Sequence, residues 1–195
     1  YNTDNVYCCT YQEEISGYMA GYAAVKLGYK HLGFLGGMSV PAVTRFGYGY
    51  VQGINDAAKE LGIAGEVEVE YVCGGQFYGD ADITGAMDTW YGTKGVEVVF
   101  ACGGGIFTSA AEAAVKTGGK VIGVDSDQAP IIDQTQEGLT VTSAMKGLST
   151  TVNTVLTDIQ DGKWSDYAGK IDNLGMVSEI PEENFVQLPT ASTQW

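Results

Sequence analysis

The feature that most limits the fold of this chain is a regular alternation of short apolar segments and helix-length segments between His31 and Asp125. Strands are predicted at residues 31–35, 67–72, 96–101 and 121–124, with helices at about 41–61, 80–90 and 106–117 between them. These spacings fit right-handed crossover connections between neighbouring parallel strands. The sequence therefore predicts an α/β fold in which a parallel sheet lies between two layers of helices.

Further elements are predicted on both sides of this region. They are a strand at 6–11, a helix at about 12–27, a strand at 139–143, a helix at about 150–161 and a strand at 170–176. The spacing Thr10-Tyr-Gln-Glu13 matches a capping box, which would start the first of these helices. Ser149 or Thr150 is expected to cap the second, and the residues after Val177 are expected to form a polar loop.

The acidic composition limits the partners that this protein can have. Its 195 residues include 24 Asp and Glu but only 10 Lys and Arg, which gives a formal net charge of −14. Nucleic acids and anionic membranes are bound by clustered basic side chains, so this charge argues against both as partners. No segment approaches the roughly 20 apolar residues of a membrane-spanning helix. The ligand is therefore expected to be neutral or held by a few local charges.

The stretch 120–128, KVIGVDSDQ, is the strongest candidate for part of a binding site. A buried parallel strand is predicted to end at Asp125, and ligands of open α/β sheets bind outside the carboxyl ends of the strands. A carboxylate in this position can accept hydrogen bonds from two neighbouring hydroxyl groups, as on a sugar. The alternative is that Asp125 only caps the following turn, which is a common position for Asp.

A second candidate is the glycine triplet Gly103, Gly104 and Gly105, which follows the predicted strand at 96–101. The triplet is not a dinucleotide fingerprint, because Thr108 stands where the third glycine of G-x-G-x-x-G would be. Glycines without side chains would instead let a ligand approach the backbone beside a helix N-terminus. The alternative is a simple tight turn.

No catalytic, cofactor or metal pattern is evident. The chain has no P-loop and no G-x-S-x-G elbow, and its one histidine, His31, begins a strand where it is expected to be structural. The four cysteines lack metal-ligand spacing and are expected to be buried or partly buried free thiols: Cys8, Cys9, Cys73 and Cys102. No cofactor is therefore expected. Hydrolysis by paired carboxylates at Asp125 and Asp127 remains open but unsupported, because residues two apart in an extended chain face opposite sides.

Several stretches together resemble the basic membrane protein family, the substrate-binding lipoproteins of ABC transporters that include purine-nucleoside receptors. They are GFLGG at 33–37 followed by Pro41 and TRF at 44–46, FACGGG at 100–105, IGVDSDQ at 122–128 and TSAMK at 142–146. The resemblance extends over almost the whole chain. It implies the type I periplasmic-binding-protein fold, in which crossing strands join two α/β lobes on either side of a cleft.

The resemblance also implies a domain organisation. Residues 29–127 would form one complete three-layer lobe, while 1–28 and 128–195 would be remnants of the first lobe and the hinge crossovers. Because the chain begins at Tyr1 and matches only the later part of the family, it is expected to be processed or a fragment. The incomplete lobe would contain about three strands with unpaired edges, and a second chain could complete it.

The resemblance further implies seven ligand-binding residues: Arg45, Phe46, Gly103, Gly104, Gly105, Asp125 and Lys146. Phe46 would stack on a purine ring, although it also fits the apolar stripe of a helix and could simply pack in the core. Asp125 would accept hydrogen bonds from ribose hydroxyls, and the glycines would admit the ligand close to the backbone. Lys146 would contact the sugar or base edge unless it is a solvated surface lysine, and Arg45 would reach the cleft unless it forms a surface ion pair.

The function implied by the resemblance is that of the substrate-binding component of an ABC importer, with a purine nucleoside as the expected ligand and a membrane permease as partner. Such a protein is not an enzyme, and it would be extracytoplasmic and lipid-anchored to the cell membrane. One alternative is a ligand sensor or regulator built on the same fold. A nucleoside-processing enzyme is the other alternative, because fold alone does not separate these functions.

Overall fold

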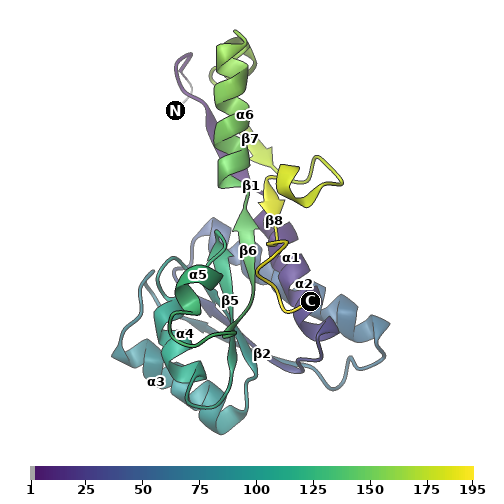
Figure 1. The fold of residues 1–195 in the computed structure, drawn as a ribbon, viewed down its shortest axis with the longest axis vertical. Helices are drawn as coiled ribbons and strands as arrows, with labels where there is room; N and C mark the ends of the chain where they lie inside the picture. Colours follow the sequence, from purple (N-terminus) through teal and green to yellow (C-terminus); the bar gives the residue numbers. More distant parts are fainter. Residues whose placement is uncertain (1–2) are drawn as a thin grey trace.

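A computed structural model describes residues 3–195. These residues form two parts of different size (Figure 1). We call the larger part the six-stranded lobe. Its sheet has the order β3-β2-β4-β5-β6-β8, and its strands are β2 (His31–Gly36), β3 (Glu68–Cys73), β4 (Val98–Cys102), β5 (Lys120–Asp125), β6 (Thr140–Lys146) and β8 (Val186–Gln187). Neighbouring strands are parallel except β8, which runs antiparallel to β6. This arrangement confirms the predicted α/β class with its parallel sheet.

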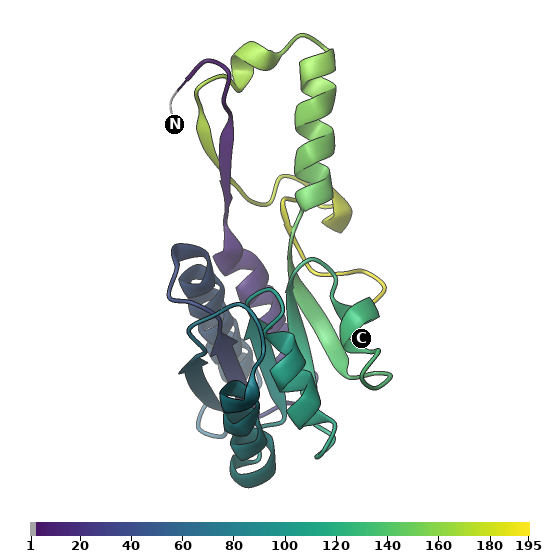
Figure 2. The same ribbon diagram turned by 90° about the vertical axis from the view of Figure 1, so that its left-hand side faces the viewer.

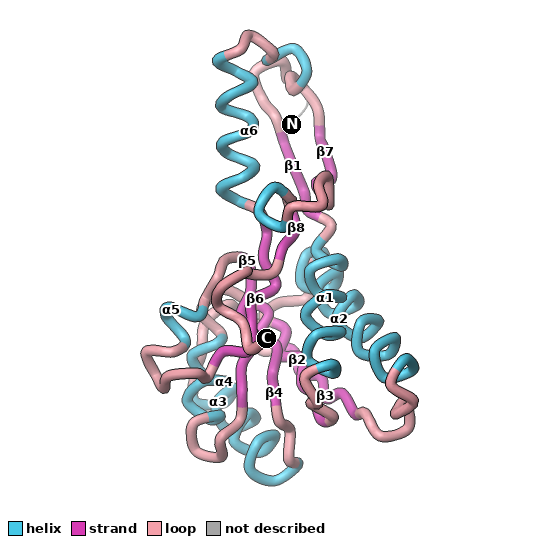
Figure 3. Tube along the Cα trace, turned by 45° about the vertical axis from the view of Figure 1, so that its right-hand side comes forward, coloured by secondary structure: helices cyan, strands magenta, loops and turns pink. Residues whose placement is uncertain are grey.

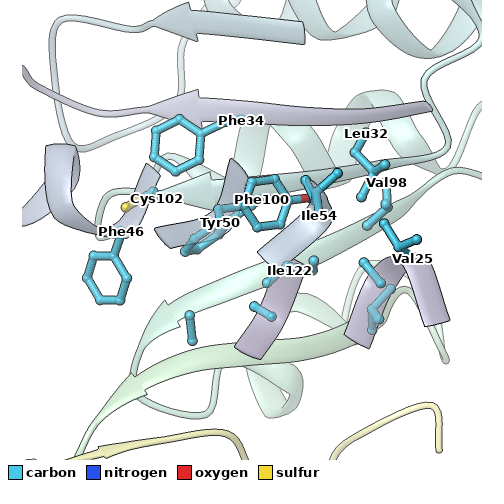
Figure 4. Packing of buried hydrophobic residues seen from close by; sticks show 14 of the residues in the cluster. Val25, Leu32, Phe34, Phe46, Tyr50, Ile54, Val98, Phe100, Cys102 and Ile122 are labelled. Atoms are coloured by element: carbon cyan, nitrogen blue, oxygen red, sulfur yellow. The ribbon is translucent and has the colours of Figure 1, made fainter. Parts of the chain in front are cut away.

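Helices cover both faces of the sheet, as a parallel sheet requires. They are α1 (Glu13–Lys26), α2 (Pro41–Glu60), α3 (Ala81–Thr89), α4 (Phe107–Ala114) and the short α5 (Ala129–Ile132), and a π-helical turn, Trp90–Lys94, continues α3. One buried cluster lies under α1 and α2, and a second lies under α3 and α4. In the first cluster, the Phe100 ring meets those of Phe34 and Tyr50 with centroids 5.3 Å apart (Figure 4).

The helices α1 and α2 cross at very short range because glycines face each other. Gly17 and Gly21 on α1, and Gly49 and Gly53 on α2, leave no room for a side chain: a Cβ atom added at any of them would collide with a backbone carbonyl of the other helix. Glycine inside a helix costs roughly 0.5–1 kcal/mol relative to alanine. These four glycines therefore lower the intrinsic stability of the two helices but allow them to pack closely. The contact fixes the first turn of α1, which carries Glu13, against α2, which carries Arg45. Both side chains belong to the candidate site described below.

The smaller part, which we call the two-stranded arm, projects from one end of the lobe (Figure 2). It consists of β1 (Cys8–Tyr11), α6 (Leu148–Gln160) and β7 (Ile171–Leu174), with a 3-10 turn at Trp164–Asp166. β1 and β7 pair in parallel, with Cys8 opposite Ile171. Two strands pair here within the part of the chain that the structure describes, rather than the three expected.

Three connections join the arm to the lobe, from β1 to α1, from β6 to α6 and from β7 to β8 (Figure 3). They pack closely: a side chain on Gly147 would collide with the Asn184 carbonyl, and one on Gly175 would collide with the Gln12 side chain. The last connection includes a 3-10 turn at Pro181–Glu183. These crossovers meet at the end of the sheet where the strands β4, β5 and β6 finish.

The six-stranded lobe is larger than the predicted 29–127. β6 pairs with β5, with Val124 opposite Ala144, and α1 covers the same face as α2, so the structure places both elements with this lobe rather than with the remnant. The family resemblance implies that the strand at 139–143 belongs to the remnant. Pairing partners, however, are set by long-range contacts that the local pattern does not contain.

Helix starts differ in part from the predictions. Asp80 caps α3, since its carboxylate accepts a hydrogen bond from the Ile83 amide at 2.9 Å. The predicted capping box at Thr10 to Glu13 does not form, because α1 begins at Glu13 and Gln12 stands at its N-cap. Similarly, Gly147 rather than Ser149 or Thr150 precedes α6. The Glu13 carboxylate bonds other side chains instead.

Candidate functional site

A cavity of about 270 Å³ lies at the carboxyl ends of β4, β5 and β6, beside the crossovers to the arm. Its lining is Val40, Ala42, Val43, Phe46, Phe77, Cys102, Gly103, Gly104, Val124, Asp125 and Lys146. Five of the seven predicted site residues therefore meet at one place. Arg45 and Gly105 are outside the lining, although both contact residues close to it.

Asp125 ends β5 with a backbone φ of 66°. It is the only non-glycine residue among residues 3–195 with a positive φ, and residues held in this region often occur at functional sites. The conformation turns the chain sharply out of the sheet at the mouth of the cavity. The Asp125 side chain is 42% exposed, so a ligand can reach its carboxylate, although Oδ1, which faces Lys146, is itself buried.

Gln128 holds this turn in place from a buried position. Its Oε1 accepts a hydrogen bond from the Val124 amide at 2.9 Å, and its Nε2 donates to the Gly104 carbonyl at 3.0 Å. Its own amide donates to Ser143 Oγ on β6 at 3.0 Å. One side chain thus links the end of β5 to the glycine triplet, which fixes the distance between Asp125 and that loop.

The glycine triplet makes room for the loop that carries Phe77. A Cβ on Gly103 would lie 2.9 Å from the Phe77 ring, and Gly104 has a φ of 51°. The Gly105 amide donates to the Phe77 carbonyl at 2.8 Å. In this structure the Phe77 loop is a segment that lies close to the glycine backbone. Contact between the glycines and a ligand stays a prediction.

Four charged side chains form a connected cluster beside the cavity. Lys146 Nζ lies 2.9 Å from Asp125 Oδ1 and 3.7 Å from Glu13 Oε1. The Arg45 Nε donates to Glu13 Oε2 at 2.5 Å, and this hydrogen bond raises the pKa of the Arg45 guanidinium. The Glu13 side chain is only 3% exposed. A carboxylate buried this deeply needs paired charges, and Arg45 and Lys146 supply them.

Lys146 also lies against two aromatic rings. Its ammonium is 5.5 Å from the centroid of the Phe46 ring and 5.9 Å from that of Tyr11. Distances of this size are favourable for cation–π attraction. Lys146 is therefore not a solvated surface lysine but part of the cavity wall.

Phe46 is a core residue in this structure. It is 1% exposed, and its ring meets Phe100 edge to face at 5.9 Å (Figure 4). The packing role that the sequence left open for Phe46 is thus present, with Lys146 over the ring on the cavity side. Its stacking on a purine stays a prediction.

Cys102 lines the cavity and is buried. Burial raises the pKa of this thiol well above its usual value, and the nearby Asp125 carboxylate raises it further. The thiol therefore stays protonated and behaves as a small apolar group. Among residues 3–195 there is no cluster of His, Cys, Asp and Glu that could hold a metal ion.

Sequence reasoning missed three residues of this site. The capping-box spacing predicts Glu13 at a helix start, and no site role is predicted for Phe77 or Gln128. A signal existed for Phe77, because an aromatic side chain in a glycine-rich loop after a strand would lie near the ligand edge of the sheet. No local pattern identifies Glu13, whose partners Arg45 and Lys146 come from other elements.

A sequence profile described as "ABC transporter substrate-binding protein PnrA-like", of the Bmp family, matches residues 1–180. The chain belongs to the Bmp family. The resemblance found in the sequence is confirmed. This family consists of transporter binding proteins rather than enzymes. A separate finding is that no helix among residues 3–195 is long and apolar enough to cross a bilayer.

Two Bmp relatives are similar in sequence over much of the chain. An "ABC transporter nucleoside-binding protein BmpA" from Lactococcus lactis is 31% identical over 174 residues, which is 82% of this chain and 48% of that protein. "Basic membrane protein B" from Borreliella burgdorferi is 32% identical over 128 residues, 64% of this chain and 36% of that protein. The chain thus spans half or less of the length of these relatives.

Solved structures share the fold at low sequence identity. A solute-binding protein of an ABC transporter system from Aeropyrum pernix aligns with a TM-score of 0.72 and 22% identity, over 95% of this chain and 50% of that one. An arabinose-binding protein from Geobacillus stearothermophilus aligns with a TM-score of 0.66 and 14% identity, over 95% and 63% of the two chains. The predicted periplasmic-binding-protein fold is confirmed.

Proposed function

We propose that this protein is the substrate-binding component of an ABC importer and that it binds a nucleoside, with purine nucleosides as the first candidates. The observation that carries the proposal is the reachable carboxylate of Asp125, held at the carboxyl end of β5 inside the cavity. A carboxylate there can accept from two adjacent ribose hydroxyls. The similarity to a relative whose name states nucleoside binding supports this choice of ligand.

The cavity suits one part of such a ligand. Its apolar wall, which includes Val40, Val43 and Phe77, would face the base, and Phe46 would contribute ring surface once Lys146 moves aside. Asp125 and Lys146 would hold the sugar. Gly103 and Gly104 would let it approach the backbone, while Arg45 would act indirectly through Glu13. A few placed polar groups in an apolar cavity are typical of small-molecule sites.

The crossovers between the lobe and the arm would act as the hinge when two lobes close on the ligand. Because the chain spans about half of its relatives, the opposite wall of the cleft would come from protein beyond the residues described, or from a second chain. The closed form would deliver the ligand to a membrane permease. We place the protein outside the cytoplasm with a lipid anchor, as proposed from its family.

Calorimetric titration of the protein in its full natural length with inosine, guanosine, adenosine and ribose tests the proposal. We expect a nucleoside to bind and the Asp125→Asn variant to bind at least tenfold more weakly, because a hydrogen bond to a charged group contributes about 1.5–3 kcal/mol. Asparagine tolerates a positive φ, so the turn should survive. Asp127→Asn, in the same loop, is the matched control and should bind normally. Absence of binding by all the nucleosides would overturn the nucleoside assignment.

A further inference from the structure

The charges around the cavity are balanced by one carboxylate that a ligand cannot reach. Glu13 is 3% exposed, whereas the Asp125 side chain is 42% exposed. Glu13 uses its two oxygens for different cations, since Oε2 accepts from Arg45 Nε at 2.5 Å and Oε1 lies 3.7 Å from Lys146 Nζ. Both basic groups near the cavity are therefore already paired with a fixed buried charge.

The position of Glu13 is set by the fold and not by the ligand. It is the first residue of α1, and the glycine contacts between α1 and α2 hold this turn beside Arg45 on α2. If a ligand drew Asp125 away, Lys146 would lose its 2.9 Å partner but would keep Glu13 as a counter-charge at 3.7 Å. The site can thus bind hydroxyl groups at Asp125 without leaving an unpaired ammonium.

We propose that Glu13 determines specificity by making this site reject phosphorylated ligands. An anion such as the phosphate of a nucleotide is bound by basic groups that have no other strong partner. Here the four charged groups, Glu13, Arg45, Asp125 and Lys146, sum to zero, and the Glu14 carboxylate adds negative charge near Arg45, so a phosphate finds no unpaired cation and meets the Asp125 carboxylate. The inference deepens the proposed function, because it explains how a nucleoside would be chosen over its monophosphate.

The test compares the chain with its Glu13→Gln variant, in which the cluster gains one net positive charge at nearly unchanged shape. Inorganic phosphate is the first probe, and its binding is measured by titration calorimetry at low salt. We expect no measurable phosphate binding by the unmodified protein and binding by Glu13→Gln that weakens as salt is added. Glu14→Gln removes a charge that acts on Arg45 more weakly than that of Glu13, so it should gain much less phosphate binding than Glu13→Gln.

The double variant Glu13→Gln/Arg45→Gln supplies the decisive control. It restores a net charge of zero to the cluster, so the phosphate binding gained by the single variant should be lost again. Near-ultraviolet circular dichroism would show that each variant is folded. If Glu13→Gln is folded and gains nothing, or if Glu14→Gln or the double variant gains equally, the assignment to Glu13 is overturned.

Ligand pairs separate this inference from the proposed function. With inosine and inosine 5′-monophosphate, we expect the unmodified protein to favour inosine and Glu13→Gln to reduce that preference at least tenfold. An unchanged preference would overturn the role of Glu13 while leaving nucleoside binding intact. If no nucleoside binds to either form, the proposed function fails and the phosphate probe alone decides the role of Glu13.

Discussion

The six-stranded lobe and the two-stranded arm differ in how much of their apolar surface is buried. In the lobe, β4 is buried along its whole length because helices cover both faces of the sheet. In the arm, α6 carries an exposed apolar stripe: Leu148, Val152, Leu156 and Ile159, each between 41% and 55% exposed. Parallel strands normally lie buried on both faces. The lobe can therefore be stable on its own contacts, while the arm depends on the crossovers and on whatever covers its open side.

The comparison predicts that the lobe core dominates the stability of the chain. Phe100 is fully buried where the rings of Phe34, Phe46 and Tyr50 meet. Phe100→Ala should lower the free energy of unfolding by about 3–5 kcal/mol, because it leaves a cavity in this cluster. Denaturant unfolding measures this, with Phe100→Leu as a control of smaller effect. A loss below 1 kcal/mol would mean that the lobe core does not hold the chain together.

The next largest effect is expected at the helix crossing of the lobe. Gly49→Ala should destabilise by about 1–3 kcal/mol through overpacking against the Glu14 backbone, although alanine favours helix by roughly 1 kcal/mol. Gly85 in α3 is the matched control, since a Cβ there meets no atom within 4 Å and Gly85→Ala should stabilise. Thermal unfolding of the two variants should therefore shift in opposite directions. Equal shifts would contradict the close crossing.

The smallest effect is expected on the open side of the arm. Val152→Ser and Leu156→Ser remove exposed apolar groups of α6, so each should change the free energy of unfolding by less than about 0.5 kcal/mol. Hydrogen exchange should also be faster in α6 than in α2, which is packed on α1 and the sheet. A loss above 2 kcal/mol from either substitution would show that this face is covered in solution, for instance by a second copy.

Part of the candidate site could be predicted from the sequence, and part of it could not. Asp125 at the end of a β-branched strand and the glycine triplet could be predicted as parts of a binding site, because strand ends and glycine turns have recognisable local sequence patterns. Residues of both stretches line the cavity. Phe46 fitted both an apolar helix stripe and a stacking role, and only its packing against Phe100 and Lys146 shows where the ring lies. The resemblance implies that the strand at 139–143 belongs to the remnant, whereas the structure pairs it with β5 in the six-stranded lobe.

The sequence by itself determined the alternation of strands and helices, the α/β class, the acidic character and the family. The first three follow from hydrophobic periodicity and composition, and the family follows from the motifs at 33–46, 100–105, 122–128 and 142–146, all of which nearby residues encode. Only the tertiary structure decided that β6 and α1 belong to the six-stranded lobe and that Glu13 joins Arg45 to Lys146. Glu13 lies far in sequence from Lys146, so their pairing depends on how separate elements pack, which no local pattern records.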